Sequence, residues 1–121
     1  MKIFLVFIGG GLGATSRYLV TTFFAGRLGN FPLGTLAINI VGSFLMGVVV
    51  GILAGKSDTE LYRVFIAVGF LGGFTTLSSF FAETLALANA GQFISVAIST
   101  FGNLIVAFFA CVAGLKFAQI F

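Results

Sequence analysis

The residues best able to do chemistry lie in the run Gly72–Phe80, which reads Gly-Gly-Phe-Thr-Thr-Leu-Ser-Ser-Phe. The run stands inside a long apolar stretch, in which Glu83 is the only charged residue between Arg63 and Lys116. In lipid an unpaired backbone or hydroxyl group costs several kcal/mol, so polar irregular backbone at membrane depth is buried in protein or lines a water-filled path. The run therefore predicts a route for an ion or a polar solute.

The same run is expected to interrupt a helix. Gly72 and Gly73 lower helix propensity, and the hydroxyl side chains that follow can bond to nearby backbone carbonyls. A break near Gly73–Thr76 would free carbonyl oxygens, which can coordinate a hard cation such as sodium, whereas hydroxyls and half-helix ends suit an anion. The alternative is a simple kink, which is common at glycine and serine sites.

A second polar group follows one face of an earlier apolar segment. Thr35, Asn39 and Ser43 are spaced four residues apart, so they share a helix face. An amide and two hydroxyls can donate hydrogen bonds to an anion without a fixed charge that would trap it. The same stripe could instead form interhelical hydrogen bonds worth about 0.6 to 2 kcal/mol each, and the residues alone favour neither interpretation.

An aromatic ring and two charges complete the candidate groups. Phe80 stands out among 17 phenylalanines by its place beside the hydroxyls, where the electropositive edge of its ring could lie against an anion. Arg17 and Glu83 are charges inside apolar segments, and such residues are functional candidates by default. They could pair, or Arg17 could attract anions into a vestibule while Glu83 lies near its mouth. Snorkelling of Arg17 with a structural ion pair is the alternative.

Membrane spans must position these groups. The chain of 121 residues is 60% hydrophobic and only 7% charged, whereas soluble domains carry about 25% charged residues. A span needs roughly 20 apolar residues, and apolar segments cover about residues 3–24, 33–54, 61–88 and 93–117. We therefore expect an all-α integral membrane protein, with residues 1–121 forming a single domain of four transmembrane helices.

Short connections and scattered charges set the expected topology. Consecutive helices run antiparallel, so both termini lie on one side. Four basic residues fall on that side against two on the other, which weakly favours cytoplasmic termini and leaves dual insertion open.

Small residues at four-residue spacing predict tight helix packing within or between subunits. They are Gly9 with Gly13, and a ladder of Ser43, Gly47, Gly51 and Gly55. Four helices are too few to enclose a generous pore, so a polar route needs a second copy or a partner chain.

Several function classes are disfavoured. The chain has no histidine, and Cys111 is its only cysteine, so a soft-metal site lacks ligands and an intrachain disulfide is impossible. The six basic residues form no run, which argues against nucleic acid as a partner. No nucleophile has an adjacent base, which argues against an enzyme.

Four ordered motifs follow one another along the chain: Gly10-Gly11-Leu12-Gly13-Ala14 with Arg17-Tyr18, Gly34-Thr35-Leu36 with Asn39, Gly42-Ser43-Phe44, and Gly72-Gly73-Phe74-Thr75-Thr76 with Phe80 and Glu83. They resemble those of the Fluc (CrcB-type) fluoride channels. The likeness runs over nearly the whole chain. It implies a fluoride-selective passive channel in the plasma membrane of a bacterium, which exports fluoride from the cytoplasm and so relieves its toxicity.

The resemblance also implies an antiparallel, dual-topology dimer with two fluoride pores and a central structural sodium ion. Its partners would be fluoride, sodium, membrane lipid and a second copy of the chain. By position, the implied fluoride pathway comprises Asn39, Phe80, Thr35, Ser78 and Leu77. Arg17 and Glu83 would correspond to the charged residues near the vestibule. Gly72 and Thr75 would offer backbone carbonyls to sodium.

The chain departs from the family pattern at Leu77. The family usually reads Thr-Thr-Phe-Ser-Thr-Phe-Ser where residues 75–81 here read Thr-Thr-Leu-Ser-Ser-Phe-Phe, so Leu77 replaces the first of two pore phenylalanines. A leucine has no electropositive ring edge, so that fluoride site should be weakened unless Phe81, one turn further on, compensates. The chain could also be one half of an obligate heterodimer completed by a homologous partner chain.

Two rival functions come from other classes. A small multidrug-type cation exporter also has four helices, but it needs a membrane-embedded carboxylate, and Glu83 lies near the end of its segment. A non-transporting assembly subunit would account for the glycine ladders but leaves the polar run without a role.

Overall fold

The computed structural model describes residues 1–121, and they form helices joined by short loops. The first two spans are α1 (Lys2–Phe24) and α2 (Leu33–Leu53). The third span consists of α3 (Glu60–Tyr62), η1 (Arg63–Leu71), α4 (Gly72–Phe74) and α5 (Ser78–Asn89). The fourth consists of α6 (Phe93–Phe101), η2 (Gly102–Val106) and α7 (Ala107–Ala118).

Four helical stretches are long and apolar enough to cross a membrane: Lys2–Phe24, Leu33–Leu53, Glu60–Asn89 and Phe93–Ala118. The prediction of an all-α fold with four candidate spans is therefore confirmed. Pro32 lies just before α2, where its missing N–H costs the helix nothing.

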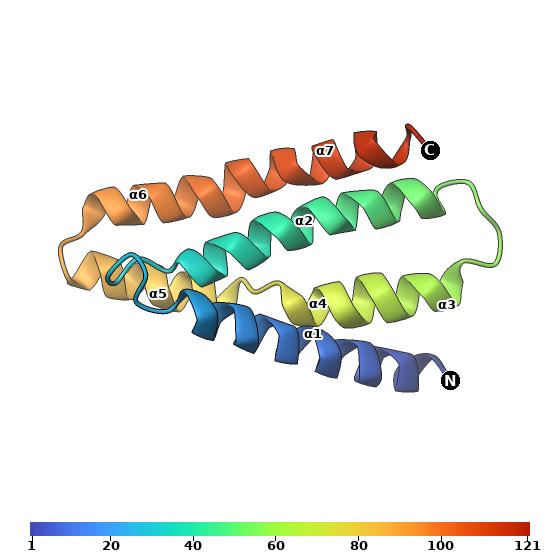
Figure 1. The fold of residues 1–121 in the computed structure, drawn as a ribbon, viewed down its shortest axis with the longest axis horizontal. Helices are drawn as coiled ribbons and strands as arrows, with labels where there is room; N and C mark the ends of the chain where they lie inside the picture. The colour runs from blue at the N-terminus through green and yellow to red at the C-terminus, as the bar shows by residue number, and fades with distance from the viewer.

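The spans lie side by side in an order that differs from their order in the chain (Figure 1). The fourth span packs on α2, α2 packs on the third span, and the third span packs on α1. Both termini and the loop between α2 and α3 lie at one end. At that end Lys2 Nζ is 2.6 Å from Glu60 Oε1. The antiparallel arrangement of consecutive spans follows the prediction from the short loops.

Glycines permit the closest approaches between spans. A methyl group at Gly13 would overlap the carbonyl oxygen of Phe70, and one at Gly47 would overlap that of Cys111. Gly55, the last residue of the predicted ladder, instead follows the end of α2 with a φ of 70°, a left-handed conformation that glycine adopts easily. The small-residue spacing thus packs α1 on the third span and α2 on the fourth, within one chain.

The third span is interrupted where its hydroxyl residues begin. Its first helical part ends at Phe74, Thr75 is extended with φ −78° and ψ 158°, and α5 begins at Ser78. The break expected near residues 73–76 therefore lies slightly later, at 75–77. Gly73 stays in the helix, where the lack of a side chain lets Gly10 of α1 pack against it.

Two stretches of wider, π-helical backbone flank this region, η1 in the third span and η2 in the fourth. Such turns are rare in proteins and frequently occur at functional sites. Nothing in the sequence predicted them, because a π turn has no distinctive residue pattern.

Candidate functional site

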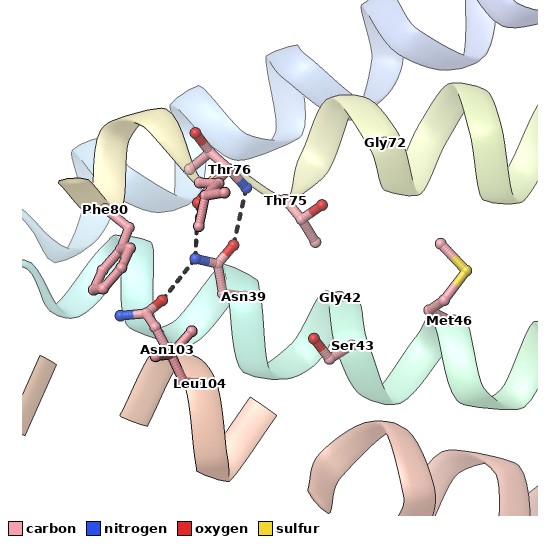
Figure 2. A pocket seen from close by; sticks show the side chains of 11 residues that line it. Asn39, Gly42, Ser43, Met46, Gly72, Thr75, Thr76, Phe80, Asn103 and Leu104 are labelled. Carbon is pink, nitrogen blue, oxygen red and sulfur yellow. Dashed lines mark hydrogen bonds between the residues drawn. The ribbon is translucent and has the colours of Figure 1, made fainter. Parts of the chain in front are cut away.

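Asn39 on α2 pairs with the backbone of Thr76 at the break (Figure 2). The Thr76 N–H donates to Asn39 Oδ1 at 2.9 Å, and Asn39 Nδ2 donates to the Thr76 carbonyl oxygen, also at 2.9 Å. A single carboxamide thereby satisfies the two backbone groups of a residue that has left the helix. This is interhelical hydrogen bonding, one of the two roles that the sequence left open for Asn39.

The break leaves the four carbonyl groups of residues 72–75 without their helical donors, and those of Gly72 and Thr75 are the two that the sequence assigned to sodium. In a continuous helix the Thr76 N–H would donate to the Gly72 carbonyl and the Ser79 N–H to the Thr75 carbonyl. Here the Thr76 N–H bonds to Asn39, and the Ser79 N–H donates to Thr76 Oγ1 at 3.3 Å. The carbonyl oxygens of Gly72 and Thr75 are therefore free to take other partners.

A hollow of about 420 Å³ opens beside this pairing, between α2, the broken third span and the fourth span (Figure 2). Its lining residues are Asn39, Gly42, Ser43, Met46, Gly72, Thr75, Thr76, Leu77, Phe80, Asn103 and Leu104. The group includes three residues assigned to the anion path from sequence and both residues assigned to sodium. The fold thus brings residues of α2 and of the third span into one cavity.

Phe80 and Leu77 both line this hollow, but with different surroundings. Phe80 is 2% exposed and its ring lies beside Asn103 (Figure 2), whereas Leu77 is 60% exposed. Phe81 is also 60% exposed and does not line the hollow. Within one chain, Phe81 therefore does not supply a ring to the hollow in place of Leu77.

Arg17 and Glu83 do not form the ion pair considered from sequence. Arg17 Nη1 donates to the Thr75 carbonyl oxygen at 3.2 Å, and Glu83 Oε1 accepts a hydrogen bond from Thr35 Oγ1 at 2.9 Å. Each group instead finds a partner on a neighbouring span: the break has freed a carbonyl for the guanidinium, and α2 supplies a hydroxyl to the carboxylate. A positive charge consequently lies against the break.

A second hollow, of about 240 Å³, lies at the loop between α1 and α2. Thr35 and Glu83 line it, and Glu83 Oε2 is buried there without a hydrogen-bond partner. Because Thr35 precedes Asn39 by about one helical turn, the two hollows are neighbours along α2. Ser78 lines neither; it is exposed, with its Oγ 3.5 Å from Thr76 Oγ1.

Asn103 is the candidate that sequence reasoning missed. Its Oδ1 accepts a hydrogen bond from Asn39 Nδ2 at 2.6 Å, and its Nδ2 donates to the Ser99 carbonyl oxygen at 2.8 Å. It lies in the π-helical stretch η2 and lines the first hollow. The available signal was an amide side chain in a largely apolar segment, since such a group needs partners at membrane depth.

Four candidate membrane spans, three of which surround a hollow at the interruption of the third span, define a small multi-pass membrane protein. Comparison with known proteins identifies its family. The family described as CrcB-like protein, Camphor Resistance (CrcB), matches residues 4–115. The chain belongs to this family.

Individual relatives agree with this assignment over nearly the full length. The chain is 41% identical over 121 residues to Fluoride-specific ion channel FluC 2 of Nitrobacter hamburgensis, which covers 98% of each chain. It is 43% identical over 117 residues to Fluoride-specific ion channel FluC of Sphingopyxis alaskensis, which covers 94% of this chain and 92% of the relative. The FluC protein of Agrobacterium fabrum is 42% identical over 121 residues, 98% of this chain and 97% of the relative. The resemblance to a channel family, rather than to an enzyme, is confirmed.

Proposed function

We propose that this chain is a fluoride-specific ion channel that lets fluoride leave the cytoplasm passively and so relieves fluoride toxicity. The observation that carries the proposal is the hollow in which Asn39, Leu77 and Phe80 meet at the break in the third span. Relatives that are 38% to 43% identical over nearly the full chain are named fluoride-specific ion channels, which supports the same activity here.

The groups around the hollow suit a small anion. Hydroxyl and amide side chains, such as those of Ser43 and Asn39, carry hydrogen-bond donors without a fixed charge that would hold an ion permanently. Phe80 contributes a ring whose edge is electropositive. Arg17 raises the local potential at the same break and would draw anions toward it.

A second copy of the chain is part of the proposal. Only 18 of 121 residues are buried, so many large apolar side chains must meet either lipid or another subunit. Leu77 lines the hollow while 60% exposed, so one chain does not close the path by itself. An antiparallel, dual-topology homodimer would cover this open side and create two equivalent paths.

The freed carbonyls of Gly72 and Thr75 fit a sodium ion at the interface of such a dimer. Unwound backbone carbonyls in membrane proteins commonly coordinate sodium, and a second copy would double the two oxygens that each chain offers. Gly72 is exposed and lines the hollow, which leaves room for a second chain beside its backbone. Arg17 already donates to the Thr75 oxygen, and the ion would share that oxygen with the guanidinium. A bound sodium ion would place a positive charge between the two subunits, where carbonyls from both breaks would coordinate it.

Fluoride efflux from liposomes that contain only this chain tests the proposal. We expect a fluoride gradient to drain rapidly while chloride is retained, as measured with ion-selective electrodes. Release of both ions at similar rates would contradict a fluoride-specific channel. Absence of fluoride release from folded protein would contradict the homodimer, and recovery on adding a homologous chain would identify an obligate heterodimer.

A further inference from the structure

Asn39 has no free hydrogen to offer an anion. Its Nδ2 carries two hydrogens, of which one goes to the Thr76 carbonyl oxygen at 2.9 Å and the other to Asn103 Oδ1 at 2.6 Å. An anion can therefore bind to this amide only by replacing one of the two acceptors. The bond to Asn103 is the candidate, because loss of the bond to Thr76 would unpair the backbone at the break.

The orientation of both amides is determined by backbone partners. Asn39 Oδ1 faces the Thr76 N–H, which can only donate, so Nδ2 of Asn39 is the atom that faces Asn103. Asn103 Nδ2 faces the Ser99 carbonyl, which can only accept, so Oδ1 of Asn103 is the atom that faces Asn39. An amide oxygen thus occupies the position on Asn39 that a fluoride ion would need.

The surroundings allow an exchange at this position. Asn39 and Asn103 both line the hollow, and Phe80 lies beside Asn103 (Figure 2). Asn103 belongs to η2, where the helix is wider than an α-helix. Its side chain is held by the bond to Ser99 and the bond to Asn39, so breaking the second bond leaves the first intact.

We propose that Asn103 Oδ1 is an internal acceptor that competes with fluoride for Asn39 Nδ2, so that an entering fluoride ion displaces it. The proposal rests on the proposed function and adds a residue that regulates access to the path. A neutral amide oxygen is a suitable competitor, because a hydrogen bond to an ionised acceptor is about twice as strong as one between neutral groups. Without fluoride, the Asn39–Asn103 hydrogen bond blocks the binding position at Asn39 Nδ2. This bond breaks when fluoride binds.

Fluoride binding to purified protein, measured by isothermal titration calorimetry, tests this competition without requiring conduction. Asn103→Ala removes the competing oxygen, and we expect the dissociation constant to fall by about three- to tenfold, the factor that corresponds to one net neutral hydrogen bond. Asn103→Ser, whose hydroxyl is too short to take the same position, should shift it in the same direction and serves where the alanine variant does not fold. Asn103→Asp keeps an acceptor and adds a negative charge, so it should weaken binding by at least about tenfold. Asn89→Ala, an exposed asparagine at the end of α5, is the matched control and should bind as the wild type.

The competition requires Asn39, which gives the decisive comparison. In an Asn39→Ala background, Asn103→Ala should no longer lower the dissociation constant for fluoride. The Nδ2 hydrogen of Asn39, which the Asn103 substitution would free, is absent from that background. Three outcomes would overturn the inference. Folded Asn103→Ala could bind fluoride with the dissociation constant of the wild type, Asn103→Ala could lower that constant equally when Asn39 is absent, or no variant could bind fluoride. Liposome efflux is measured separately: a wild-type chain that conducts no fluoride but shows the predicted binding shifts would refute the proposed function alone.

Discussion

Thr76 is bonded to Asn39 through both its N–H and its carbonyl group, so one side chain of α2 replaces two backbone hydrogen bonds of the third span. The break is therefore maintained by a neighbouring span and does not depend on glycine flexibility alone. The Asn39 bond to the Thr76 N–H releases the Gly72 carbonyl, and the Ser79 N–H bond to Thr76 Oγ1 releases that of Thr75.

Asn39→Ala should weaken both the fold and the path. We expect the free energy of unfolding to fall by about 1 to 3 kcal/mol, because the Thr76 backbone groups lose their partner, and fluoride efflux from liposomes to fall as well. Asn39→Asp is the matched variant, since it keeps an acceptor for the Thr76 N–H but adds a charge that repels anions. Wild-type efflux through well-folded Asn39→Ala would remove Asn39 from the path.

The two neighbouring phenylalanines of α5 should differ in their importance. Phe80→Ile replaces a buried ring that lines the hollow, and we expect it to reduce fluoride efflux strongly because the electropositive ring edge is lost. Phe81→Ile changes a ring outside the hollow and should leave efflux close to that of the wild type. Equal losses in the two variants, compared at equal amounts of folded protein, would contradict this assignment.

Leu77→Phe should increase fluoride efflux. Leu77 is exposed at the edge of the hollow, so a larger ring has room there and adds a second electropositive edge to the path. Leu77→Met, which adds length without a ring, is the control for side-chain size. If the two variants conduct as the wild type does, the ring missing from this chain has no part in its conduction.

Gly47→Ala should destabilise the chain by separating two spans. Its methyl group would overlap the carbonyl oxygen of Cys111 on α7, and overpacking of this kind costs about 1 to 3 kcal/mol. Gly11→Ala is the matched control, because no atom lies within 4 Å of the added methyl group and alanine favours a helix over glycine by about 1 kcal/mol. Thermal unfolding in detergent should separate the two variants, and similar unfolding temperatures would refute the packing argument.

Sodium should stabilise the protein against heat. A site of freed carbonyls binds only the folded state, so the stability gained is about 2.7 kcal/mol at a sodium concentration 100 times the dissociation constant. We expect the unfolding temperature to rise with sodium but not with N-methyl-D-glucamine at equal ionic strength. Arg17→Gln removes a positive charge from the Thr75 carbonyl and should strengthen the response to sodium. An unfolding temperature that is independent of sodium in both proteins would contradict the site.

The spans and the break could be predicted because both follow from local chemistry. Uninterrupted apolar segments must form helices in lipid, and the Thr75–Thr76 pair after two glycines indicates a helix end. Their positions relative to one another could not be obtained in this way. Which hydroxyl faces the hollow depends on the rotation of each helix, and Ser78 accordingly lies outside while Thr76 lies inside.

The hydrogen-bond partners of the charged and amide side chains could not be predicted from the sequence either. Arg17 and Glu83 lie toward the same membrane face, yet each bonds to a neutral oxygen instead of to the other. Asn103 was missed because it belongs to no motif, although it closes the hydrogen-bond chain from Thr76 through Asn39 to Ser99. Such a chain appears only when three spans are placed together.

The glycine contacts have a consequence for how the protein is made. Gly13 packs on the third span and Gly47 on the fourth, so each of these two contacts forms only after an intervening span has been synthesised. Synthesis proceeds at about 5 to 20 residues per second, and α1 and α2 must wait in the bilayer during that time with their glycine faces covered by lipid or by each other. Assembly of the native packing is therefore delayed until the last span has entered the membrane. A chain that lacked α7 would leave Gly47 and Gly51 of α2 without the span that packs on them.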